Sequence, residues 1–300
     1  MLITEMYSIK NFLDYLTYQK RYSRHTIISY ENDLRAFFDY ITIQFDGPAI
    51  DEISSSIVRS WLASLKEQAI SSKTINRKIS SLKSYFKYEL RLGRIASTPM
   101  TVISSLKVNK RLPSFIAQKD IQLLLREVEF PGTWMGMTDH LLLQIFYNTG
   151  VRLSELINLK ESQVDTGNNS LKVLGKGGKE RIVPLHNHLL GLINNYIREK
   201  ARNNNTHGSE FLLVNDKGTK LYPKYAYRVV RKYLGTVSTN ERKSPHILRH
   251  SFATHLTNNG ADINAVKELL GHSSLASTQV YTHNSIDRLK DIYKLSHPKS

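Results

Sequence analysis

The chain has 300 residues, a formal net charge of +16 and no cysteine. Its length is sufficient for two domains, each with its own core, and the absence of cysteine excludes disulfides, thiolate catalysis and cysteine-ligated zinc. The basic surplus favours a polyanionic partner such as nucleic acid, because each neutralised phosphate releases counterions, although it also fits a merely basic, soluble protein.

The distribution of apolar residues does not indicate a membrane protein. No apolar run approaches the roughly 20 residues that span a bilayer, and the N-terminal sequence MLITEMYSIKNF lacks the basic and apolar regions of a secretory signal. An anionic membrane surface is a weaker candidate than nucleic acid, because no long basic amphipathic stretch stands apart from the core pattern. We therefore expect a cytoplasmic protein.

Residues 1–95 are predicted to form a helical domain. Apolar residues recur with the helical period, and serine or threonine stands where N-caps are expected. The four predicted helices span 6–19, start after Ser23, start at Ser54–Ser56, and run from Ser72 or Thr74 to Gly93. Basic residues are scattered along them: Arg24, Arg59, Lys73, Arg77, Lys78, Lys83 and Lys87. A small DNA-binding domain and a bundle with solvated charges both fit this pattern.

Residues 96–113 are predicted to be a linker between the two domains, because they show no sustained period and contain proline, serine and lysine. The second domain, 114–300, is predicted to be mostly helical, so the fold class is mainly α with a small β-sheet or hairpin.

The segment SLKVLGKGGKERIVPL (170–185) predicts that hairpin. Gly177 and Gly178 can supply the positive φ angles of a two-residue turn. Lys176 and Lys179 then flank the tip, where they could reach a DNA groove or be ordinary solvated turn residues.

The segment HILRHSFATHL (246–256) predicts a phosphate site at a helix N-terminus. Ser244 suits the N-cap, Pro245 the first helical position, and Gly260 the C-terminal end. His246 and Arg249 are three residues apart in the first turn, so they share a face where free backbone N–H groups and the helix dipole favour an anion.

A second arginine, Arg152, follows Gly150 at the predicted end of an apolar helix. Guanidinium groups bind phosphate oxygens in a bidentate manner, and two of them can balance the charge of a pentacoordinate transition state. Arg152 could equally form an ordinary salt bridge with Glu155.

Two more candidates lie nearer the C-terminus. His272 follows a predicted helix from Asp262 to Gly271, and Tyr281 stands in STQVYTHN. Alone, Tyr281 would be one of 16 tyrosines with a packing role. His246 and His250 also have a spacing that fits zinc, but no HExxH motif or cysteine supports a metal.

The combination resembles the tyrosine site-specific recombinases of the phage-integrase family, Xer type. The resemblance covers essentially the whole chain and is most specific in TGVRLSELINL, in LGKGGKERIVPL, and in the segment from HILRHSFATHL through ELLGHSS to QVYTH. It implies a two-domain, C-shaped DNA clamp with an N-terminal SAM-like domain that binds the core DNA. The catalytic set that it implies is Arg152, Lys176, His246, Arg249, His272 and Tyr281.

The resemblance also implies the roles of these residues. Tyr281 would attack a DNA phosphate to give a 3′-phosphotyrosyl link and a free 5′-hydroxyl, with His246 as the base and Lys176 as the general acid. Arg152, Arg249 and His272 would hold the phosphoryl oxygens. The adduct stores the bond energy, so no cofactor, ATP or divalent metal is implied.

The expected partners are double-stranded DNA with a dif-like recombination site and further recombinase protomers. A homo- or hetero-tetramer on two sites is implied, possibly with a paralogous recombinase and the FtsK translocase. The tail 285–298 is predicted to form a short helix that packs on its own domain or docks on a neighbouring protomer.

Three alternatives remain open on the sequence. A mobile-element integrase or invertase would use the same chemistry, although a single helical module before the catalytic domain favours the Xer type and chromosome-dimer resolution. A type IB topoisomerase-like enzyme would relax DNA as a monomer without paired sites. A DNA-binding protein without catalysis would bind DNA and form no adduct.

Overall fold

The computed structural model describes residues 9–108, 115–206, 208–240 and 243–271, with the side chain of Lys176 excepted. The chain divides into two compact units, Met1–Arg111 and Leu112–Ser300. Within the described residues, no helix is both long and apolar enough to cross a membrane.

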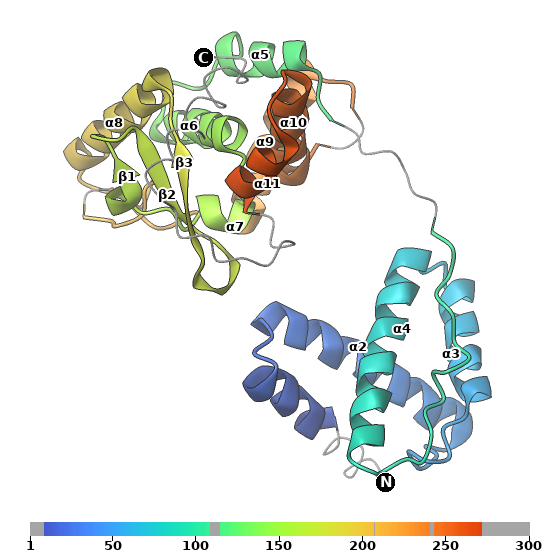
Figure 1. Ribbon diagram of the computed structural model, residues 1–300. Helices are drawn as coiled ribbons and strands as arrows, with labels where there is room; N and C mark the ends of the chain where they lie inside the picture. Colours follow the sequence, from blue (N-terminus) through green and yellow to red (C-terminus); the bar gives the residue numbers. More distant parts are fainter. Residues whose placement is uncertain (1–8, 109–114, 207, 241–242, 272–300) are drawn as a thin grey trace. The chain divides into compact units, whose positions relative to one another are not determined.

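The first unit is helical and is built around α2, α3 and α4 (Figure 1). Residues 9–14 are helical and continue into the π-helical turn η1, Tyr15–Gln19. The three longer helices are α2 (Arg24–Phe45), α3 (Ser55–Glu67) and α4 (Ser72–Arg91). Their buried faces meet in a core that contains Phe37, Trp61 and Tyr85.

Serine N-caps begin these helices. The side chains of Ser23 and Ser54 accept hydrogen bonds from the backbone N–H groups of Thr26 and Ile57, which confirms both predicted starts. The fourth helix begins at Ser72, one of the two predicted starts, and its N-cap is Ser71, whose side chain accepts a hydrogen bond from the Thr74 N–H at 3.3 Å. Thr74, the other predicted start, lies inside the first turn.

The segment after α4 packs on the first unit. Ile95, Met100 and Ile103 are buried in its core, and the side chain of Asn76 exchanges two hydrogen bonds with the backbone of Leu106. Much of the segment 96–113, which the sequence suggests as a linker, is thus held by apolar contacts to α4 and its neighbours.

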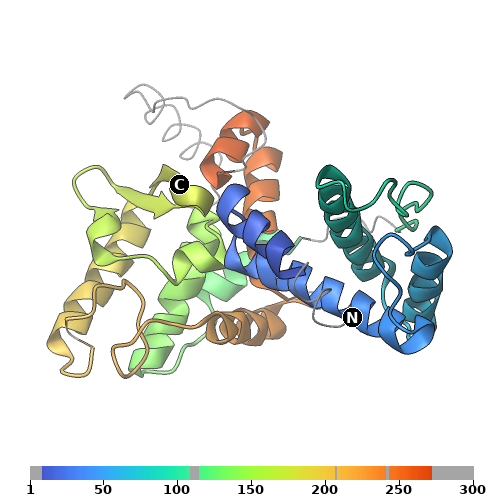
Figure 2. The ribbon, with the colours of Figure 1, turned by 90° about the horizontal axis from the view of Figure 1, so that it is seen from below.

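The second unit has α6 at its centre, with α8 on one side and α9 and α10 on the other (Figures 1 and 2). Its helices are α5 (Gln118–Arg126), α6 (Trp134–Thr149), α7 (Leu153–Leu156), α8 (Asn187–Arg202), α9 (Pro223–Val237), α10 (Pro245–Asn258) and α11 (Ile263–Leu270), with the 3-10 turn η2 (Glu161–Gln163). Most of α6 is buried, in keeping with its apolar sequence.

A three-stranded antiparallel sheet completes the second unit in the order β1-β2-β3, with β1 (Val164–Asp165), β2 (Ser170–Leu174) and β3 (Glu180–Pro184). The mainly helical fold with a small sheet is therefore confirmed. The predicted two-residue turn was wrong: Leu174 pairs with Glu180, so five residues lie between the strands. They include the 3-10 turn η3 (Lys176–Gly178), and the Gly175 N–H closes the loop by donating a hydrogen bond to the Lys179 carbonyl at 2.7 Å.

Candidate active site

Arg152 lies just after α6, where the chain changes direction sharply. Gly150 ends α6 in the left-handed conformation with φ of 59°, and a Cβ atom there would come within 2.4 Å of the Phe252 ring. Glycine is needed for this close approach. The turn places Arg152 at the N-cap of α7 with its side chain 33% exposed, so its guanidinium group can be reached from solvent.

The buried carboxylate of Glu155 lies between Arg152 and Arg181. Its Oε1 accepts hydrogen bonds from Arg152 Nη1 at 2.7 Å and from Arg181 Nη1 at 3.0 Å. Its Oε2 accepts from Arg181 Nη2 at 2.7 Å and from the backbone N–H of Arg152 at 2.8 Å. Burial raises the pKa of Glu155, but these hydrogen bonds and the charge of Arg181 outweigh it and lower the pKa to about 2. The carboxylate therefore stays ionised near neutral pH.

At the C-terminal end of α11, three successive carbonyl groups, the last of which belongs to the C-cap, each accept a hydrogen bond from a different arginine. Arg181 Nε donates to Leu269 O at 2.9 Å, Arg249 Nη2 to Leu270 O at 2.6 Å, and Arg152 Nη2 to Gly271 O at 2.8 Å. Carbonyl groups at a helix C-terminus lack intrahelical partners and carry the negative end of the helix dipole. The arginines thus fix the backbone just before His272.

Arg249 is the most enclosed of the predicted phosphate ligands. It is 8% exposed, and its Nη1 donates to the carbonyl of Gly150, the residue that turns the chain toward Arg152. Burial and then the nearby charge of Arg152 lower the pKa of Arg249 to about 10. The guanidinium therefore remains charged near neutral pH and is ordered before any ligand arrives.

The cluster has more positive charge than its own carboxylate can neutralise. Arg152, Arg181 and Arg249 carry three guanidinium charges, against the single charge of Glu155. Each guanidinium has five N–H donors, so the two bonds that Arg152 and Arg249 each make to described residues leave donors for further acceptors. A partly exposed, preorganised cluster of this kind can bind a phosphate group.

His246 lies in the first turn of α10 and is exposed, one turn before Arg249. Ser244 occupies the N-cap position and Pro245 the first helical position, as predicted, and the Ser244 side chain makes no capping bond within the described residues. The N-terminus of this 14-residue helix therefore presents backbone N–H groups beside His246.

The structure brings together only part of the predicted set. Arg152 and Arg249 share the end of α11, and His246 shares α10 with Arg249. Lys176 is placed by its backbone alone, in the loop between β2 and β3. His272, Tyr281 and the tail 285–298 lie outside the described residues.

Arg181 is the residue that the sequence reasoning missed, and Glu155 was considered only as a salt-bridge partner. A signal for Arg181 does exist in the alternation of the hairpin. Leu171 and Val173 on β2 and Val183 on β3 are buried, and Arg181 pairs with Val173 on the same buried face. An arginine in an inward position of a strand needs a charged or polar partner in the core.

The first unit presents a separate basic surface on α4. Lys73, Arg77, Lys83 and Lys87 are exposed on this helix. The buried carboxylate of Asp33 on α2 holds this surface in place by accepting hydrogen bonds from Arg77, Lys78 and Ser81. Arg77 stays about half exposed while it makes this contact, so it can be oriented toward a phosphate.

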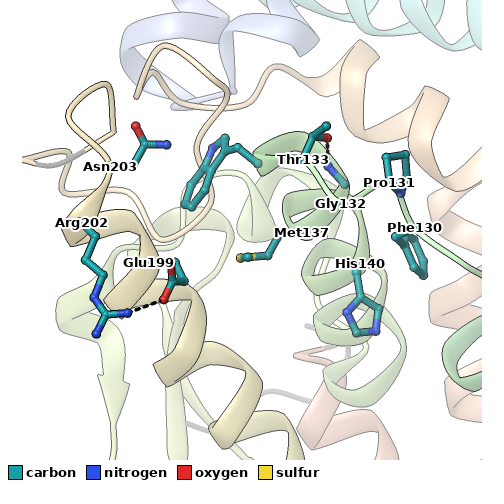
Figure 3. Close-up of a pocket in the computed structure, with 11 residues that line it drawn as sticks. Phe130, Pro131, Gly132, Thr133, Met137, His140, Glu199, Arg202 and Asn203 are labelled. Atoms are coloured by element: carbon teal, nitrogen blue, oxygen red, sulfur yellow. Dashed lines mark hydrogen bonds and ion pairs between the residues drawn. The ribbon is translucent and has the colours of Figure 1, made fainter.

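A pocket of about 440 Å³ between α6 and α8 is unrelated to the arginine cluster (Figure 3). Phe130, Trp134 and Met137 give it an apolar wall. Its charged residues, Glu199 and Arg202, pair with each other at 2.9 Å. This pair therefore leaves no excess positive charge in the pocket for a phosphate group.

Each of the two units matches a known protein family domain. Residues 9–93 match the N-terminal SAM-like domain of phage integrases, and residues 114–288 match the Phage integrase family. Tyrosine recombinase XerC of Listeria innocua is 38% identical over 298 residues, which cover 97% of each chain. The XerC protein of Chlorobaculum parvum is 34% identical and covers 97% of this chain and 94% of its own.

Solved structures share the fold. XerH recombinase bound to a palindromic difH substrate aligns with a TM-score of 0.71 at 24% identity, over 89% of this chain and 78% of that one. A lambda integrase dimer bound to a core site aligns with a TM-score of 0.68 at 15% identity, over 92% and 99%. The chain thus belongs to the phage integrase family and is a tyrosine recombinase, an enzyme that cuts and rejoins DNA strands.

Proposed function

We propose that this protein is a Xer-type site-specific recombinase that acts on double-stranded DNA at a dif-like site through a 3′-phosphotyrosyl intermediate. The observation that carries the proposal is the preorganised arginine cluster at the end of α11. Arg152 and Arg249 use only some of their N–H donors in contacts with described residues, so both can donate to a phosphate. Near full-length similarity to XerC proteins and the shared fold with the XerH–difH complex support the choice of site.

In this proposal, Tyr281 is the nucleophile. A tyrosine has an ordinary pKa near 10, so it must lose its proton as it attacks the phosphorus atom. His246, exposed at the start of α10, is the base that takes this proton. The new bond joins the Tyr281 oxygen to phosphorus, and the bond from phosphorus to the 5′-oxygen breaks.

Arg152, Arg249 and His272 hold the non-bridging oxygens, on which negative charge increases in the pentacoordinate transition state. Electrostatic groups that are already ordered stabilise this charge without reorganising. Lys176 delivers a proton to the leaving 5′-oxygen. The 5′-hydroxyl of a partner strand then attacks the phosphotyrosine and reverses the sequence, so the bond energy is retained without ATP or a metal ion.

The proposed assembly is a tetramer on two DNA sites, made of copies of this chain or of this chain and a paralogous recombinase. Its cellular role is then the resolution of chromosome dimers, with the FtsK translocase as a candidate activator. The basic surface on α4, with Arg77 held by Asp33, is the proposed contact of the first unit with the DNA backbone.

A plasmid with two directly repeated dif-like sites from the source genome tests the proposal. The wild-type protein, alone or with its paralogue and FtsK, is expected to resolve the plasmid into two circles, and the Tyr281→Phe variant is expected to bind the sites without recombining them. Relaxation of a plasmid that lacks the sites, by the protein alone, would instead indicate a topoisomerase. Site binding with no resolution under any of these conditions would contradict the proposal.

A further inference from the structure

Arg181 is buried on β3 in a position that the sheet otherwise fills with apolar side chains. Its side chain is 5% exposed, and it pairs in register with Val173. Three of its N–H groups are used: two bind both oxygens of Glu155, and Nε binds the carbonyl of Leu269. One side chain therefore links β3, α7 and the end of α11.

The same side chain also packs against the backbone just before two predicted catalytic residues. A Cβ atom on Gly175, which precedes Lys176, would lie 3.7 Å from Arg181 Nη1 and 3.6 Å from Glu155 Oε1. A Cβ atom on Gly271, which precedes His272, would lie 3.2 Å from Arg181 Cδ. Glycine at position 271 thus lets the backbone approach the Arg181 side chain closely. At Gly175 the backbone adjoins the Arg181–Glu155 pair at ordinary van der Waals distance.

A buried ion pair is a poor means of stabilising a fold, because apolar residues of similar volume often replace it at no cost. A planar guanidinium bound to both oxygens of a carboxylate does, however, fix direction as well as distance. The pair thus fixes the position of the loop that carries Lys176 relative to Arg152, because Arg152 and Arg181 both donate hydrogen bonds to Glu155 Oε1.

We propose that Arg181 is a positioning residue that holds the Lys176 loop in register with Arg152 through the shared carboxylate of Glu155. This inference rests on the proposed function, in which Lys176 protonates the 5′-oxygen as the bond from phosphorus to that oxygen breaks. Arg181 itself contacts neither DNA nor the reacting atoms in this account.

A substrate with sulfur in place of the bridging 5′-oxygen tests the inference. A thiol is a much stronger acid than an alcohol, so the 5′-thiolate leaves without a proton from Lys176. The protein is incubated with a nicked dif-like duplex of each kind, and the rate of covalent adduct formation is measured for wild type, Lys176→Ala, Arg181→Lys and the double variant. Arg198→Lys, an exposed arginine on α8, is the matched control.

Arg181→Lys keeps the charge but loses the two-point contact with Glu155. We expect it to slow cleavage of the oxygen substrate about 100-fold, the effect of a displacement near 1 Å, with DNA affinity unchanged. On the sulfur substrate the rate should return to within a few-fold of wild type. The double variant should be no slower than Lys176→Ala on the oxygen substrate, because both changes remove the same step.

Gly175→Ala provides a second variant if Arg181→Lys does not fold. The backbone at Gly175 is extended, so alanine is tolerated there, but its Cβ would lie 3.2 Å from the carbonyl of Lys179, so the loop that carries Lys176 must shift by a few tenths of an ångström beside the ion pair. The same sulfur rescue is expected. A defect of Arg181→Lys or Gly175→Ala that sulfur leaves unchanged, while Lys176→Ala is rescued, would overturn the inference. If sulfur fails to rescue Lys176→Ala itself, the proposed role of Lys176 fails, and the inference with it.

Discussion

Arg249 and Arg152 donate hydrogen bonds to two successive carbonyl groups, those of Leu270 and Gly271, at 2.6 and 2.8 Å. The two arginines are almost 100 residues apart in sequence, and one helix end brings them into a single cluster. Because these carbonyl groups orient the guanidinium groups without neutralising their charge, the site is ordered for an anion before DNA binds.

Replacement of Arg249 by lysine is expected to slow DNA cleavage about 100- to 1000-fold, as the loss of one preorganised donor does in other enzymes. Lysine cannot reach the carbonyl groups of both Gly150 and Leu270 while it also binds a phosphate oxygen. Single-turnover cleavage of a nicked duplex measures the effect. Arg126→Lys, on the exposed surface of α5, is the control, and an Arg249→Lys enzyme with the wild-type rate would contradict the assignment.

The Glu155→Gln substitution is expected to destabilise the second unit at neutral pH. The pKa of Glu155 is lowered from its ordinary 4.5 to about 2, so its ionised form contributes about 3 kcal/mol of folding stability. A lowered folded-state pKa means that this contribution is complete above pH 4.5 and is lost as the pH falls toward 2.

Urea unfolding at pH 7, 5 and 3.5 measures this difference. The gap between wild type and Glu155→Gln should be widest at pH 7 and should narrow below pH 4.5. Glu199→Gln, which removes a surface pair with Arg202, should change stability by less than about 1 kcal/mol at every pH. A gap for Glu155→Gln that stays constant with pH would show that the ionised carboxylate is not responsible.

The sequence predicted several helix ends in each of the two units, because these depend on local residues. Gly150, Gly260 and Gly271 all adopt positive φ after a helix, and Ser23 and Ser54 cap helices as expected. The Ser71 cap was not identified, because three serine and threonine residues, Ser71, Ser72 and Thr74, lie within 71–74 and only the backbone geometry selects one.

The partners of Arg181 could not be predicted from sequence, because they come from three separate segments. Glu155 lies on α7 and Leu269 at the end of α11, so only the packed fold brings them to β3. The resemblance to a family suggested the catalytic set, but only the folded structure shows that the Glu155 carboxylate joins Arg152 and Arg181. The loop at Gly177 and Gly178 was misjudged because positive φ at both positions also fits turns wider than two residues.

Arg77→Ala is expected to weaken DNA binding and to lower its salt dependence. Arg77 is exposed on α4 and oriented by Asp33, so it should contact one phosphate. The slope of log K against log salt concentration should fall by about 0.9. Arg35→Ala is the control, since Arg35 is an exposed arginine of α2 that lies outside the basic surface on α4. An unchanged slope for Arg77→Ala would remove this residue from the proposed DNA surface.

Chelation of divalent metal ions is expected to leave DNA cleavage unchanged. In the proposed mechanism, Arg152 and Arg249 supply the positive charge that the transition state needs, which metal ions supply in other phosphoryl-transfer enzymes. Cleavage rates with and without EDTA are compared, with a magnesium-dependent nuclease on the same duplex as the control. Loss of cleavage in EDTA, with recovery on addition of magnesium, would contradict the proposed mechanism.

The most direct test of the central claim is covalent trapping on a nicked dif-like duplex, with the products separated on a denaturing gel and the modified peptide identified by mass spectrometry. We expect a protein–DNA adduct through Tyr281 that Tyr281→Phe abolishes and that Tyr227→Phe, a control at an exposed tyrosine on α9, retains. An adduct formed by Tyr281→Phe, or one that maps to another residue, would contradict this claim.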